Sequence, residues 1–120
     1  MRDDKDNIIV NKSFEFALKI IEFAELLESQ RKFVLANQIL KSGTSIGANI
    51  IEAQNAESKS DFIHKMKIAV KEADETEYRL LLCKFSNKYP FDEILLENIQ
   101  ELIRILSKII SSSKNKTILK

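Results

Sequence analysis

The 120-residue sequence has few of the residues that break regular structure: two glycines, one proline and no tryptophan. β-Sheet proteins need frequent turns, which are rich in glycine and proline, so this scarcity argues against a β architecture. Many Leu, Ile, Lys and Glu residues favour long helices with short connections, and the length suits one domain. The sequence therefore predicts a single all-α domain over residues 1–120.

The sequence also has little of what catalysis and metal binding require. Cys83 is the only cysteine and lies in an apolar helical pattern, which predicts a packed thiol. His64 is the only histidine, so the two Glu-x-x-His pairs of a di-iron bundle cannot be built, and we predict that it faces solvent. No nucleophile, base and orienting group can be assembled. We therefore expect no enzyme, no metal, no cofactor and no small-molecule substrate.

A net charge of +1 provides no global attraction to nucleic acid or to an anionic membrane. The first ten residues carry three aspartates where a signal peptide would be basic. No apolar run approaches the roughly 18 residues of a membrane span. We expect a cytoplasmic protein that does not associate with membranes.

Apolar residues recur at helical spacing in four segments. The first predicted helix runs from about residue 13, with Ser13 as its N-cap, to about residue 29, and the second from about 33 to about 55. The predicted core comprises Phe16, Ile20, Phe23, Ile39, Ile46, Ile50, Phe62, Ala69, Ala73, Leu80, Leu102 and Leu106.

Capping residues delimit the last two helices. The third is predicted to begin at Ser58, with Asp61 as in a capping box, and to reach about Asn87. Asp92 is predicted to cap the fourth, which reaches about residue 110. We expect an ordered core of about 11–112 with a flexible lead-in and tail. Short connections make an antiparallel up-down four-helix bundle the economical arrangement.

The second helix is the most unusual, because Lys41 is the only charge between Lys32 and Glu52 although 31% of the chain is charged. A helix with one solvent-exposed face would carry more charge, so we expect a second surface of this helix to be covered. A homo-oligomer would cover it. Gly43 and Gly47 argue against helix, at about 1 kcal/mol each relative to alanine. The apolar period continues through them, which favours a continuous helix with a close neighbour; the alternative is a break at residues 42–45.

Polar residues lie beside the apolar stripes of the second and third predicted helices. They could be a solvated face, or a buried hydrogen-bonded layer inside the bundle or between subunits, which would fix register and partner choice. We define this polar seam as Lys41, Ser42, Ser45, Asn49 and Glu52 with Lys65, Glu72, Glu75, Thr76 and Arg79, and we expect interface or binding contacts from it.

The chain resembles the small bacterial four-helix-bundle family first associated with intervening sequences in 23S ribosomal RNA genes. The resemblance rests on QILKSGTSIGANIIEA (residues 38–53), Ser58, DFI (61–63) and IAVKEADETEY (68–78), and by length and pattern it covers about residues 11–110. It implies an antiparallel four-helix bundle that assembles as a ring-like homopentamer. The accessory protein of diversity-generating retroelements is similar, and that relative binds nucleic acid and a reverse transcriptase through a basic pentameric barrel.

Two positions depart from the family pattern. Lys41 stands where many members have Arg, and lysine lacks the bidentate fork that suits phosphate. Arg79 stands where many have Trp, which favours an exposed or subunit-interface position. The near-neutral charge also differs from the basic retroelement protein.

The resemblance implies a non-enzymatic, self-assembling scaffold that docks RNA, ribosomal RNA included, or a protein partner. The alternative is a purely structural interaction module with no nucleic-acid role. A salt series of RNA binding separates them, because phosphate contacts make affinity fall with salt.

Overall fold

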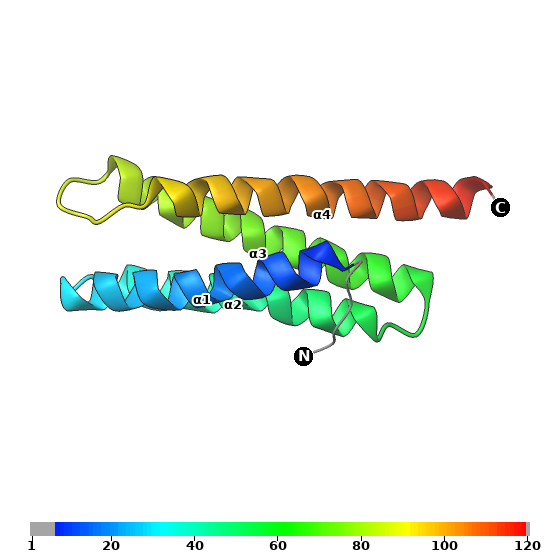
Figure 1. The fold of residues 1–120 in the computed structure, drawn as a ribbon, viewed down its shortest axis with the longest axis horizontal. Helices are drawn as coiled ribbons and strands as arrows, with labels where there is room; N and C mark the ends of the chain where they lie inside the picture. Colours follow the sequence, from blue (N-terminus) through cyan, green and yellow to red (C-terminus); the bar gives the residue numbers. More distant parts are fainter. Residues whose placement is uncertain (1–6, 120) are drawn as a thin grey trace.

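The computed structural model describes residues 7–119, with side chains described as far as residue 115. Four helices form the fold: α1 (Ile8–Ser29), α2 (Phe33–Gln54), α3 (Lys59–Phe85) and α4 (Glu93–Leu119). None of the described residues is in a strand, so the predicted all-α class is confirmed. α1 packs against α2 and α4, and α3 packs against the same two helices. Figure 1 shows the resulting elongated shape, with α1 and α2 on one side and α3 and α4 on the other.

The predicted starts of α3 and α4 are confirmed by their capping contacts. The Ser58 hydroxyl oxygen accepts a hydrogen bond from the Asp61 amide at 3.0 Å, and the Asp61 carboxylate accepts one from the Glu57 amide at 3.3 Å. At α4, the Asp92 carboxylate accepts from the Ile94 amide at 2.9 Å. These bonds satisfy amides that have no partner within the first helical turn.

α1 begins earlier than predicted, and its cap is Asn7 instead of Ser13. The Asn7 side chain accepts from the Val10 amide at 3.4 Å. Ser13 is buried within the helix, where its hydroxyl donates to the Val10 carbonyl at 3.0 Å. The reason is that Ile9 and Val10 are both buried and extend the apolar stripe by a further turn.

The helical segment is also longer at the other end of the chain, because α4 continues to Leu119, well beyond the predicted end near residue 110. The predicted flexible lead-in lies mostly in residues 1–6, which are outside the described residues. Residues 8–10 of that lead-in are helical, so the prediction of a flexible segment is wrong for them.

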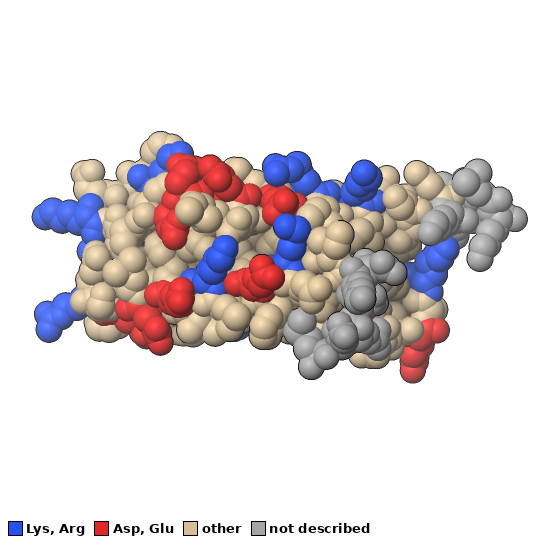
Figure 2. Space-filling view, in the orientation of Figure 1, with Lys and Arg blue, Asp and Glu red and all other residues tan. Residues whose placement is uncertain are grey.

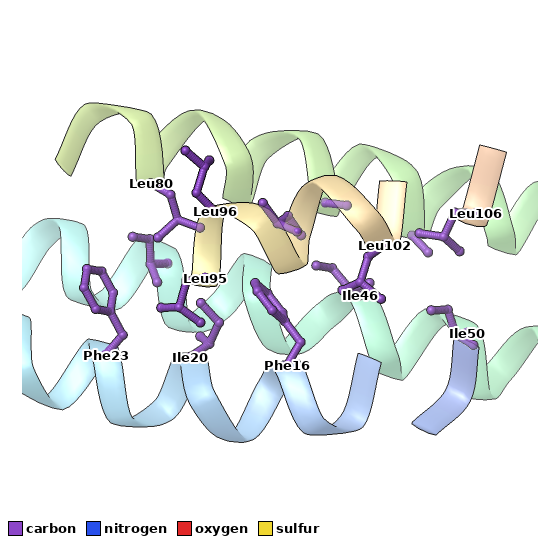
Figure 3. Packing of buried hydrophobic residues seen from close by; sticks show 14 of the residues in the cluster. Phe16, Ile20, Phe23, Ile46, Ile50, Leu80, Leu95, Leu96, Leu102 and Leu106 are labelled. Atoms are coloured by element: carbon purple, nitrogen blue, oxygen red, sulfur yellow. The ribbon is translucent and has the colours of Figure 1, made fainter. Parts of the chain in front are cut away.

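The core lies on the shared axis of the four helices, and Figure 3 shows side chains from all of them pointing toward one another. Every predicted core residue is buried except Phe62, which is half-buried and packs against the core. Cys83 is buried as predicted. The helical periods read from the sequence therefore identify the core correctly.

α2 is continuous through both glycines, so the alternative of a break at residues 42–45 is wrong. A Cβ atom on Gly43 would lie only 2.8 Å from Cγ2 and 2.9 Å from Cγ1 of Ile20 on α1. Ile20 is fully buried and cannot move aside. The missing side chain at Gly43 thus permits the close approach of α1 and α2.

Replacing each glycine by alanine should separate helix propensity from packing. For Gly43→Ala, overpacking of about 1–3 kcal/mol should outweigh the propensity gain of about 1 kcal/mol. Gly47→Ala is the matched control, since its nearest contact would be an ordinary 3.4 Å to the Ser13 hydroxyl oxygen. It should raise the free energy of unfolding by up to about 1 kcal/mol. Denaturant titration that finds both variants equally stable would contradict the tight contact at Gly43.

A second prediction concerns Ile50, whose side chain is fully buried (Figure 3). Ile50→Ala should lower the free energy of unfolding by about 2–5 kcal/mol, because it removes buried methyl groups and leaves a cavity. Val34→Ala is the control, since Val34 is 73% exposed and its truncation should change stability by less than about 0.5 kcal/mol. Thermal or denaturant unfolding measures both. A loss at Ile50 no larger than at Val34 would remove Ile50 from the core.

Candidate functional site: a polar seam and an apolar outer face

The centre of the polar seam lies between α2 and α3 within a single chain. The Thr76 and Ser42 hydroxyl oxygens are hydrogen-bonded at 2.9 Å, and both residues are buried. Thr76 also donates to the Glu72 carbonyl at 2.8 Å. Thr76 has only one hydroxyl proton, but both contacts are satisfied at once if the Ser42 hydroxyl supplies the proton between the two side chains. A hydroxyl pair therefore joins the two helices inside the core.

A second contact between α2 and α3 lies near the C-terminal end of α2. Lys65 of α3 donates to the Glu52 carboxylate at 3.2 Å. The Glu52 side chain is 60% exposed, so this ion pair contributes little to stability. It does align α2 with α3 in the same register as the hydroxyl pair. The seam is thus partly buried and partly solvated.

The remaining seam residues of α2 bond to their own helix. The Ser45 hydroxyl donates to the Lys41 carbonyl at 2.6 Å, and the Asn49 amide donates to the Ser45 carbonyl at 2.9 Å. Lys41 is exposed, whereas Ser45 and Asn49 are half-buried. Ser45 and Asn49 therefore make hydrogen bonds within α2 and do not need α3 for them.

Glu72, Glu75 and Arg79 are the seam residues of α3 without a side-chain partner. All three are half-buried, and none makes a side-chain hydrogen bond or ion pair within residues 7–115. Glu75 and Arg79 are four residues apart, yet they form no ion pair. They remain available to a partner.

An apolar outer face lies along α1 and α2, away from the core. A shallow groove of about 160 Å³ runs between the two helices there, and its floor is formed by the small residues Ala17, Gly47 and Ala48. We define the apolar outer face by its large, partly exposed side chains: Phe14, Leu18 and Ile21 of α1 with Leu40 and Ile51 of α2. The missing charge on the second helix predicted a covered surface there, but the contribution of α1 to it was not predicted. The signal was the spacing of Phe14, Leu18 and Ile21 at i, i+4 and i+7.

The face formed by α1 and α4 is different, because it mixes charges of both signs (Figure 2). A groove of about 170 Å³ there is lined by Lys12, Lys19, Glu15 and Glu101 among others. Lys12 donates to Glu101 at 3.3 Å. Among the described residues, this face therefore presents no continuous patch of positive or negative charge.

The ionisable groups that might perform chemistry are dispersed. Burial raises the pKa of Cys83 to about 11, so its thiol is protonated near neutral pH. Burial, and secondarily the charge of Glu77, raise the pKa of Asp74. His64 is exposed, as predicted. In the part of the chain that the structure describes, no three His, Cys, Asp or Glu side chains are placed to hold a metal ion, and no helix could cross a membrane.

The hydroxyl pair can be tested by a double-mutant cycle. Thr76→Val keeps the shape of the side chain but leaves the buried Ser42 hydroxyl without its cross-helix partner, which should cost about 1–3 kcal/mol of unfolding free energy. The double variant Ser42→Ala/Thr76→Val removes both polar groups and should be closer to wild type than additivity predicts. Denaturant unfolding of the four proteins gives the coupling energy. A coupling indistinguishable from zero would show that the two hydroxyls do not depend on each other.

Comparison with known proteins places the chain in a family. A family model described as "23S rRNA-intervening sequence protein" matches residues 5–112. The crystal structure of a protein from Bacteroides thetaiotaomicron VPI-5482, described as having unknown function and as from the S23 ribosomal protein family, is 44% identical with a TM-score of 0.80. The match covers 86% of this chain and 98% of that one. No curated protein matches. Because the family model covers most of the sequence, the chain belongs to the family of 23S rRNA-intervening sequence proteins.

Proposed function

We propose that the protein is a non-enzymatic, self-assembling helical scaffold that acts in the cytoplasm and docks RNA or a protein partner. Its fold in this proposal is an antiparallel up-down four-helix bundle. Support for the up-down order comes from the short connections, residues 30–32, 55–58 and 86–92, and from the packing of each helix on its neighbours in sequence. The apolar outer face is the observation on which the proposal rests.

The large apolar side chains of this face remain exposed to water in an isolated monomer. Phe14 is 49% exposed, Leu18 50% and Ile51 40%. Contiguous exposed apolar surface of this kind is typical of an interaction site, since covering it removes apolar area from water. The small residues in the floor of the groove would let side chains of a second copy approach closely. A second copy of this chain is therefore the occupant that we propose.

A ring needs two different faces on each copy, one for each neighbour. α3 supplies a second apolar stripe, formed by Tyr78, Leu82 and Phe85, of which Phe85 is 77% exposed. The stripe belongs to a helix that does not contact α1. Contact between this stripe and the apolar outer face of the next copy would join copies head to tail. The family resemblance suggests five copies.

Docking of a partner is the second part of the proposal. The half-buried, unpaired Glu72, Glu75 and Arg79 support a role in specificity, because polar groups at a boundary can be completed by a partner. The family description names 23S rRNA intervening sequences, and on that ground we propose ribosomal RNA as the RNA partner. The mixed charge of the α1 and α4 face favours the alternative, a protein interaction module without nucleic acid (Figure 2).

A charge on the apolar outer face should disrupt assembly. Leu18→Asp places a carboxylate in the proposed contact, where burial without a partner is costly, so the oligomer should dissociate toward monomer. Leu26→Asp is a matched control, because Leu26 lies on the same helix at 45% exposure but outside this face. Light scattering coupled to size exclusion measures the mass of each protein. Wild type that is a stable monomer at micromolar concentration would refute self-assembly.

A further inference from the structure

Positive charge is strongly segregated in this nearly neutral protein. Residues 62–71 and 102–120 contain eight of the 19 Lys and Arg residues and none of the 18 Asp and Glu residues. The net charge of +1 does not reveal this segregation, because the two stretches lie far apart along the chain. The first is the N-terminal half of α3 and the second the C-terminal half of α4.

The fold brings these two stretches together. A groove of about 330 Å³ lies between them, and we call it the lysine groove; it is lined by Lys67, Val70, Ser107, Ile110, Ser111 and Lys114. No carboxylate is among the lining residues. The apolar outer face is formed by α1 and α2, whereas the groove is formed by α3 and α4. The α3 stripe proposed as the second contact face begins at Tyr78, about 16 Å along the helix from Lys67 at 1.5 Å per residue, so the groove lies beside the proposed contact and not within it.

Two ammonium groups meet in the lysine groove without an acidic partner. The neighbouring Lys67 side chain lowers the pKa of Lys114, first as a hydrogen-bond donor that only the neutral amine of Lys114 can accept, and then as a like charge. Neither lysine forms an ion pair among the described residues. Two cations held this close repel each other, and an anion bound between them would relieve that repulsion. The Ser107 and Ser111 hydroxyls supply further donors in the same groove.

We propose that the lysine groove binds phosphate groups of an RNA backbone. This inference rests on the RNA docking proposed above and identifies where it occurs. Phosphate oxygens accept hydrogen bonds from lysine and serine donors, and charge-assisted bonds of this kind are the stronger ones. Val70 and Ile110 provide the apolar lining, which offers no donors or acceptors for base edges, so binding is independent of sequence.

The cations extend beyond a single ion site. Arg104, Lys108 and Lys114 are spread over about 15 Å of α4, at 1.5 Å per residue. Lys71 is exposed on the facing helix. Arg104 and Lys108 lie outside the groove lining, on neighbouring parts of the α4 surface. Cations spread over this length suit a chain of phosphates better than one free phosphate ion. RNA is therefore favoured over a small oxoanion as the ligand.

Binding of a fluorescent oligouridylate, followed by anisotropy over a salt series, tests the assignment. In Lys67→Ala/Lys114→Ala, the slope of log affinity against log salt should become shallower by about 1.4, at about 0.7 for each phosphate contact on a single strand. The affinity near 0.1 M salt should fall about 25-fold, which follows from the same two contacts. Lys12→Ala/Lys19→Ala is the matched control, because it removes the same charge from the mixed-charge face and should bind like wild type.

The outcomes separate this inference from the proposed function. If wild type binds RNA with a salt dependence that both double variants share, RNA docking stands and the lysine groove is the wrong site. If assembled wild type binds no oligouridylate at any salt concentration, RNA docking and the groove assignment both fail while self-assembly stands. If titration with inorganic phosphate shifts the NMR signals of the Lys67 and Lys114 side chains but RNA does not bind, the groove is an oxoanion site and the RNA assignment is overturned.

Discussion

The contact between Gly43 and Ile20 sets the distance between α1 and α2, because even a methyl group at Gly43 would overlap the buried isoleucine. That distance has consequences on both sides of the helix pair. Toward the core, it lets Ile20 fill the space at the centre of the bundle. On the outside, it leaves a shallow groove with a floor of alanine and glycine instead of a flat, charged surface. One small residue thus shapes both the stability and the proposed assembly of the protein.

α2 is in contact with α1 and α3, and the two contacts differ in chemistry. Its contact with α1 is made mainly through small and apolar residues, which pack tightly, and one polar contact closes it where the Asn7 cap of α1 donates to the Gln54 side chain at 2.7 Å. Its contact with α3 includes the Ser42 and Thr76 hydroxyl pair, which has one correct alignment. Within the described residues, no buried side-chain nitrogen or oxygen lacks a hydrogen-bond partner. Packing therefore supplies stability, while the hydroxyl pair and the Asn7–Gln54 hydrogen bond favour one register.

Helices, caps and core were predictable because their signals are local. Ser58 and Asp92 act as caps through amides within three residues of them, and the core follows from one helical period. Ser13 was misassigned because a serine before an apolar run resembles a cap, while the buried Ile9 and Val10 continue the helix upstream. The site was less predictable because its contacts join distant segments. Nothing local shows that Thr76 meets Ser42, or that Lys67 and Lys114 share one groove.

The near-neutral net charge argued against binding to RNA when only the sequence was considered, and the fold changes that argument. Salt screens charges beyond about 8–10 Å at physiological ionic strength, so a phosphate senses the charges beside it and not the total for the molecule. Acidic residues lie on the mixed-charge face of α1 and α4 (Figure 2), and none of them lines the lysine groove. At the lysine groove, two acid-free helical stretches face each other and their fields add. A polyanion would consequently be attracted to the lysine groove at short range, although the nearly neutral protein as a whole does not attract it at long range.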